Sequence, residues 1–118
     1  MVTLLLGALL SSLAAADELG DPKKGAKHFA DICAACHGER GDGKGPAGGA
    51  LKPPPRDFTD TALMTKLSDA HLIEVISKGG AAVGKSPLMP AWGGVLKPKE
   101  VRDVAAYIRS FAPVSEVE

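Results

Sequence analysis

The sequence predicts a small all-α domain whose interior is filled partly by a bound group rather than by side chains alone. Hydrophobic residues recur at helical spacing in several segments, and no stretch of useful length alternates with the two-residue period of a strand. Fourteen glycines and nine prolines leave long segments without regular structure, while one Trp, one Tyr and three Phe are present in 118 residues. A chain this short, with so few large side chains, buries little apolar surface unaided.

The charge balance argues against a dedicated nucleic-acid-binding protein. The chain has 14 Lys plus Arg and 14 Asp plus Glu, so its formal net charge is zero. Nucleic-acid-binding domains normally carry a basic excess on one face. A hydrophobic content of 45% and a charged content of 24% are typical of one globular domain and not of a disordered chain.

Residues 1–16 are typical of a secretory signal peptide, although they lack the usual basic start. They contain no charged side chain, residues 2–10 are almost wholly apolar, and Ala14–Ala16 precede Asp17. The run is shorter than the roughly 20 residues of a membrane-spanning helix, so an uncleaved anchor is the weaker alternative. We expect cleavage after Ala16, leaving one domain of residues 17–118 outside the cytoplasm, in a bacterial periplasm. Free thiols usually oxidise there unless another reaction consumes them.

The first predicted helix begins after Asp21 and ends near Gly38. Asp21 is a good capping residue, and Pro22 lacks an N–H that would be unpaired at this position. Its helical spacing is carried by Gly25, Phe29, Ile32, Cys33 and Cys36. Residues 38–57, rich in glycine and ending in three prolines, are predicted to be loop, and such a long loop needs something to wrap around.

Three more helical segments are expected. Thr59–Lys66 form a short helix, and Ser68 caps a longer one that ends at Gly79. The last helix runs from Pro98 to Phe111. Its apolar stripe is formed by Val101, Val104, Ala105, Ile108 and Phe111. Residues 79–98 are a second loop, and residues 112–118 are a frayed tail.

The strongest functional signal is the sequence Cys33-Ala-Ala-Cys36-His37. Positions i, i+3 and i+4 of a helix share one face, so two thiols and an imidazole converge on one planar ligand. This is the attachment pattern of a c-type haem. We therefore expect one covalently bound haem c. Cys33 and Cys36 form the thioethers, and His37 is the proximal ligand of the iron.

Three other uses of the two cysteines are less consistent with the sequence. A redox-active Cys-x-x-Cys normally lies where a strand meets a helix, and no strand is predicted. A structural zinc site needs four ligands, and no second cysteine pair exists. A plain disulfide leaves His37 without a role.

Met89 is the expected distal iron ligand. An electron-transfer haem needs both axial positions filled, and Met89 lies between Pro87 and Pro90 in a loop that can display its thioether rigidly. A His/Met pair also favours a relatively high reduction potential. The other candidates are weaker. Met1 leaves with the signal peptide, Met64 is expected in the core, and His28 and His71 are expected to be solvated helix residues.

These features together resemble the class I c-type cytochromes, the small soluble monohaem electron carriers. The resemblance covers nearly all of residues 21–111. It includes the attachment motif, the loops at 41–47 and 53–58, the methionine loop at 88–93 and the closing helix at 104–111. It implies the cytochrome c fold, in which three to five helices pack around one haem and the N- and C-terminal helices cross.

The resemblance also implies several contacts. Gly25 and Phe29 are expected to meet Val104 and Tyr107 where the two terminal helices cross. A loop proline carbonyl is expected to accept a hydrogen bond from the free ring nitrogen of His37, and either Pro46 or one of the prolines at 53–55 qualifies. The haem propionates are expected near Trp92, Arg56 and Lys52.

The resulting prediction is a soluble monomer that is not an enzyme. It shuttles single electrons between unidentified extracytoplasmic redox partners of a respiratory chain, without nucleic acid and without stable membrane insertion after cleavage. One alternative is a cytochrome c subunit of a larger oxidase, dehydrogenase or reductase complex. Another is a haem sensor or gas-binding enzyme with an open coordination position, which requires that Met89 does not ligate.

Overall fold

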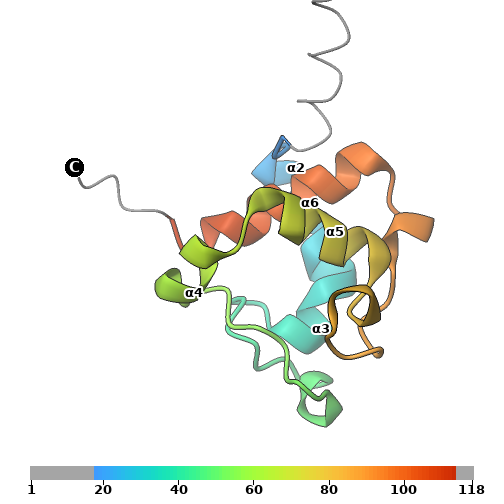
Figure 1. The fold of residues 1–118 in the computed structure, drawn as a ribbon. Helices are drawn as coiled ribbons and strands as arrows, with labels where there is room; N and C mark the ends of the chain where they lie inside the picture. Colours follow the sequence, from blue (N-terminus) through green and yellow to red (C-terminus); the bar gives the residue numbers. More distant parts are fainter. Residues whose placement is uncertain (1–17, 114–118) are drawn as a thin grey trace, which may run out of the picture.

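A computed structural model describes residues 18–113 of the chain (Figure 1). The predicted signal peptide and cleavage site therefore lie outside the described residues. No strand occurs in residues 18–113, and the all-α class is confirmed. The α-helices are α2 (Pro22–His28), α3 (Ala34–His37), α4 (Thr61–Lys66), α5 (Asp69–Lys78) and α6 (Pro98–Ser110). The shorter turns are η1 (Phe29–Cys33), η2 (Gly48–Ala50), η3 (Ala81–Val83) and η4 (Trp92–Gly94).

The first predicted helix forms over the expected range but contains an irregular turn. The Asp21 side chain accepts a hydrogen bond from the Lys23 N–H at 2.9 Å, and Gly38 ends the helix with a φ of 84°. Between α2 and α3, η1 is a π-helical turn. A π turn takes up an additional residue, so it changes the direction in which the following side chains point. Cys33 is the last residue of this turn, directly before α3.

The later helices follow their local sequence signals closely. Asp60 caps α4 by accepting a hydrogen bond from Leu63 N–H at 3.1 Å, so the helix begins at Thr61 instead of the predicted Thr59. Ser68 caps α5 in the same way, through His71 N–H at 3.0 Å. A short polar side chain that satisfies an unpaired N–H fixes where a helix starts.

The predicted crossing of the terminal helices is confirmed: α2 and α6 pack closely against each other (Figure 1). The backbone of Gly25 in α2 lies so close to α6 that a Cβ added there would overlap the Asp103 carbonyl. The Phe29 ring centroid lies 5.3 Å from those of Tyr107 and Phe111. Val104 is fully buried at this contact. Glycine is therefore required at position 25 for a steric reason.

Replacing Gly25 with alanine is expected to destabilise the haem-loaded protein by about 1–3 kcal/mol. Alanine in a helix interior normally stabilises the helix by roughly 0.5–1 kcal/mol relative to glycine. A loss of stability would therefore show that the close helix contact outweighs this preference. The control is Gly49→Ala, because a Cβ at Gly49 meets no atom within 4 Å. Denaturant unfolding followed by circular dichroism measures the free energy of unfolding of both variants. Equal stability of the two variants would contradict the close crossing.

Asp103 is a buried carboxylate at the same crossing, and it was not identified from the sequence. It is 2% exposed and accepts hydrogen bonds from the Asp21 N–H at 2.7 Å and from the Lys99 ammonium at 3.2 Å. Burial raises the pKa of the Asp103 carboxyl, but these two donors outweigh it and hold the pKa below its ordinary value. The carboxylate thus stays ionised and joins the start of α2 to α6.

Arg109 joins α6 to the turn between α4 and α5. Its guanidinium donates to the Met64 carbonyl at 2.6 Å, to the Leu67 carbonyl and to the Asp69 carboxylate at 2.8 Å. These carbonyls lie at the C-terminal end of α4, where helix carbonyls lack intrahelical partners. Met64 is 2% exposed in the core, as predicted. Arg109 therefore fixes the start of α5, the helix that faces the attachment motif.

Candidate functional site

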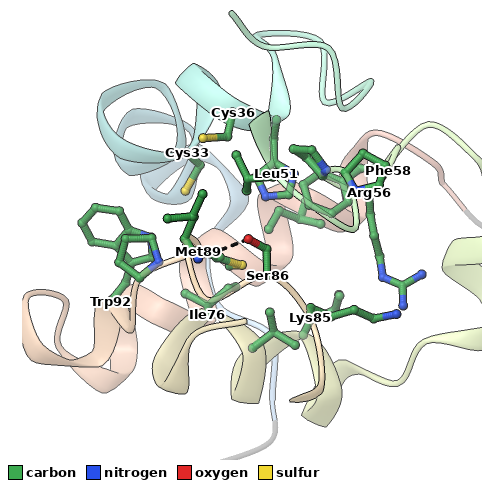
Figure 2. Close-up of a pocket in the computed structure, with 18 of the residues that line it drawn as sticks. Cys33, Cys36, Leu51, Arg56, Phe58, Ile76, Lys85, Ser86, Met89 and Trp92 are labelled. Carbon is green, nitrogen blue, oxygen red and sulfur yellow. Dashed lines mark hydrogen bonds between the residues drawn. The ribbon is translucent and has the colours of Figure 1, made fainter. Parts of the chain in front are cut away.

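An apolar cavity of about 250 Å³ lies between the cysteine-bearing helix, α5 and the two long loops (Figure 2). One buried water needs roughly 10–15 Å³ on the same measure, so the cavity has room for a much larger group. Leu72, Val75 and Ile76 contribute one wall from α5, and Phe29 and Ile32 contribute another from η1. No Asp or Glu side chain of the described residues lines it. The interior is therefore suited to a large, mainly apolar ligand.

Cys33, Cys36 and His37 all line this cavity, so the structure brings the attachment motif together. Figure 2 shows the two cysteine side chains at the helix side of the cavity. They do not form a disulfide with each other. Burial, reinforced by the neighbouring Cys36, raises the pKa of the Cys33 thiol to about 12. Redox-active dithiols require the opposite, a lowered thiol pKa, so this environment does not favour a redox Cys-x-x-Cys centre.

The His37 imidazole is held in its neutral form beside the cysteines. Burial lowers its pKa, and an interaction with the Arg56 backbone offsets part of that fall. The ring stacks on Phe58, with centroids 4.5 Å apart and planes 17° from parallel. Phe58 is itself buried, so the stack restricts the orientation of the imidazole. A neutral, oriented imidazole is the form in which histidine binds a metal.

The predicted hydrogen bond from His37 to a proline carbonyl is absent. Its Nδ1 is buried and has no hydrogen-bond partner among the described residues, and the backbone group that acts on the ring belongs to Arg56. The Pro55 carbonyl instead lies against Gly43, where an added Cβ would be 2.7 Å from the oxygen.

Met89 also lines the cavity, on a hydrogen-bonded turn within the predicted loop. Its N–H donates to the Ser86 carbonyl at 3.2 Å, and its carbonyl accepts from Gly80 N–H at 3.1 Å. Buried Ser86 also accepts a hydrogen bond through Oγ from Leu88 N–H at 3.2 Å, drawn as the dashed line in Figure 2. Ser86 was missed in the sequence, although serine before proline is a common turn signal.

The remaining candidate ligands lie in varied surroundings. Met64 does not line the cavity. His28 is not simply solvated, because its Nε2 lies 3.2 Å from the Glu100 carboxylate on α6. His71 is also not simply solvated, since it is half-buried and lines the cavity. Met1 lies outside the described residues.

The residues expected near the propionates are only partly brought together. Trp92 and Arg56 line the cavity, whereas Lys52 does not. Lys85, which was not singled out in the sequence, does. Among the described residues, no group of three or more His, Cys, Asp or Glu side chains is arranged as a metal site, which leaves a structural zinc site without a donor set.

The profile of the cytochrome c family matches residues 22–112. This chain belongs to the cytochrome c family. The cofactor of this cytochrome c domain is covalently bound haem c with its iron. The apolar cavity, the paired sulfurs and the buried imidazole fit that group. When bound, the haem supplies reversible one-electron chemistry at the iron.

Several known proteins are similar to this cytochrome c domain. It is 38% identical over 91 residues to the cbb3-type cytochrome c oxidase subunit FixP of Bradyrhizobium diazoefficiens, covering 77% of this chain and 28% of that subunit. It is 33% identical over 88 residues to the cbb3-type cytochrome c oxidase subunit CcoP of Cereibacter sphaeroides. That match covers 75% of this chain and 27% of that subunit. The chain thus spans little more than a quarter of these curated relatives.

A solved structure, the KustC0563 c-type cytochrome, is also similar. It is 30% identical with a TM-score of 0.60, and the match covers 75% of this chain and 96% of that one. The cytochrome c fold expected from the sequence is therefore confirmed. Within the described residues, none of the helices has the length and apolar character needed to cross a bilayer.

Proposed function

We propose that this cytochrome c domain transfers single electrons as part of a cbb3-type or related terminal oxidase complex. Cys33 and Cys36 would hold one haem c, and His37 and Met89 would be its axial ligands. The observation that supports this proposal is one apolar cavity lined by the two cysteines, His37 and Met89, which come from two distant segments of the chain. Two protein ligands leave the iron no open position, which favours electron transfer over gas binding or catalysis.

The proposed ligand roles follow from what each side chain does in the cavity. The two cysteines anchor one edge of the planar group, and stacking on Phe58 orients His37. The hydrogen bonds around Ser86 hold the Met89 turn in place. The apolar walls exclude water, so little solvent has to reorganise when the charge of the iron changes. A neutral thioether favours the ferrous state and a relatively high potential.

Membership of a complex is supported by the relatives, which are oxidase subunits by name. For this reason we place the subunit ahead of the free monomeric shuttle, which the sequence alone favours. The donor would be another redox protein outside the cytoplasm, in the periplasm of a bacterium. The catalytic chain of the oxidase would be the acceptor.

A free soluble carrier is the second candidate. One observation favours it, namely that this domain covers 96% of the KustC0563 c-type cytochrome, so a unit of this size also occurs as nearly a whole chain. In that case docking would be brief, through a small and weak interface.

Affinity purification of the tagged chain from mild detergent extracts of its host decides between the two. Co-purification of a haem–copper oxidase chain, with oxygen-dependent oxidation of the bound haem, is the expected result. The control is the tagged Cys33→Ala, Cys36→Ala variant. Recovery as a lone red protein in the soluble fraction would support the carrier. A colourless product would contradict both candidates.

A further inference from the structure

The turn that carries Met89, formed by residues 86–89, is held against the C-terminal end of α5 by backbone hydrogen bonds. The Gly80 N–H donates to the Met89 carbonyl at 3.1 Å. The Gly80 carbonyl accepts from the Lys85 N–H at 2.8 Å, directly before the turn. Within the turn, the Met89 N–H donates to the Ser86 carbonyl at 3.2 Å. Gly80 is therefore hydrogen-bonded to the chain at both ends of the turn.

Gly80 has no room for a side chain at this contact. A Cβ added there would overlap the Ser86 carbonyl oxygen and would lie 3.3 Å from the Met89 Cβ. The backbone of Gly80 has a φ of −66° and a ψ of −40°, a conformation that any residue adopts without strain. Glycine is therefore needed here for space and not for its conformational freedom. The space that it leaves is occupied by the turn that bears Met89.

Two further contacts confine the turn. A Cβ added at Gly79 would lie 3.0 Å from the Met89 carbonyl oxygen, so both glycines at the end of α5 lie against the turn. Ser86 is 4% exposed, and its Oγ accepts the Leu88 N–H at 3.2 Å, inside the turn. The Leu88 side chain is 62% exposed and so adds little packing. The placement of Met89 thus depends mainly on backbone contacts with the glycine pair and on Ser86.

We propose that Gly80 and Ser86 are positioning residues that keep Met89 bound to the iron and so control how readily an external ligand replaces it. This inference rests on the proposed function, in which Met89 is the distal ligand. A thioether is a weak donor of electron pairs. When the protein holds it beside the iron, it binds at a high effective concentration. That advantage falls when the turn is free to leave the end of α5.

The test measures imidazole binding to the ferric, haem-loaded full chain. Imidazole binds the iron only when Met89 is detached, so its apparent affinity reports the detached fraction. Gly80→Ala places a methyl group against the Ser86 carbonyl and should favour the detached form. The affinity for imidazole should rise about tenfold or more, tenfold being about 1.4 kcal/mol. The near-infrared sulfur-to-iron band should weaken in the same variant.

Two matched glycine variants separate the positioning of Met89 from general stability. A Cβ at Gly93 would lie 2.8 Å from the Ser77 carbonyl oxygen, so Gly93→Ala disturbs the packing of η4 on α5 instead of the Met89 turn. It should lower the free energy of unfolding and leave the affinity for imidazole close to that of the wild type. A Cβ at Gly94 meets no atom within 4 Å, so Gly94→Ala should change neither quantity.

Ser86→Ala is a milder variant that tests the proposal even if Gly80→Ala does not fold. It removes one hydrogen bond of the turn, so the affinity for imidazole should rise about two- to tenfold. Ser86→Thr keeps the hydroxyl and should restore most of the wild-type value. Affinities in the Gly80 and Ser86 variants equal to that of Gly94→Ala would overturn this inference alone, as would an equal rise in Gly93→Ala. A wild type without the sulfur band would reject Met89 as the ligand, and with it the ligand set of the proposed function.

Discussion

Replacing Cys33 and Cys36 together by alanine is expected to give a colourless chain with little of the native helical circular dichroism. Without the covalent group, the apolar cavity of about 250 Å³ is left open. At roughly 24 cal/mol per Å³ of empty volume, leaving this cavity unfilled would lower the stability of the fold by up to about 6 kcal/mol. This is an upper limit, because the cavity is open to solvent on one side. Small domains are stable by only about 5–15 kcal/mol. The loss therefore removes much or all of the stability of the fold.

Absorption spectra, the mass of the intact chain and thermal melts followed by circular dichroism check this expectation. Each single variant, Cys33→Ala or Cys36→Ala, is the matched control, because one thioether can still retain the haem. The singles should therefore be coloured and folded, but less stable than the wild type. A double variant without haem that keeps full helicity and melts sharply would show that side chains alone fill the core.

Replacing Met89 by alanine is expected to change the electronic properties of the haem while leaving the fold intact. The near-infrared sulfur-to-iron band of the ferric protein should disappear, and the ferrous form should bind carbon monoxide rapidly through the vacated position. The reduction potential should fall by on the order of 0.1 V or more, within the span of about 0.8 V that axial ligands control. Optical spectroscopy and a redox titration measure these three changes.

Met64→Leu is the control for Met89→Ala, because Met64 is buried in the core and does not line the cavity. This near-isosteric change should cost less than about 1.5 kcal/mol and leave the spectrum unaltered. If Met89→Ala keeps the sulfur band, Met89 is not the ligand. If the wild type itself lacks that band, a haem with an open coordination position becomes the better interpretation.

The helices could be predicted well because their ends depend on residues that are adjacent in the chain. Asp21, Ser68 and Gly79 act through hydrogen bonds or backbone angles within a few residues of themselves. The prediction was less accurate at α4, where Asp60 takes the capping position and delays the start by two residues. The π turn at Phe29–Cys33 was not predicted, because helical periodicity tolerates one irregular turn without changing its pattern.

The candidate site was only partly visible in the sequence. The order Cys33, Cys36, His37 defines a chemical pattern by itself, and Met89 stands out between two prolines. Arg56 was suggested only by the resemblance, and Lys85 gives no such signal, since an isolated basic residue in a loop is usually solvated. The resemblance also suggested a hydrogen bond between His37 and a proline carbonyl, but the Nδ1 atom of His37 has no partner within residues 18–113.

By itself, the sequence determined the all-α class, the helix caps and the haem-attachment motif, because each depends on neighbouring residues and on spacing along one helix. Tertiary structure alone decided which distant groups face one another. It buried Asp103 at the helix crossing, placed Arg109 against the end of α4 and brought two cations to one cavity. The physical reason is that burial and charge pairing depend on segments that are far apart in the chain, which no local pattern records.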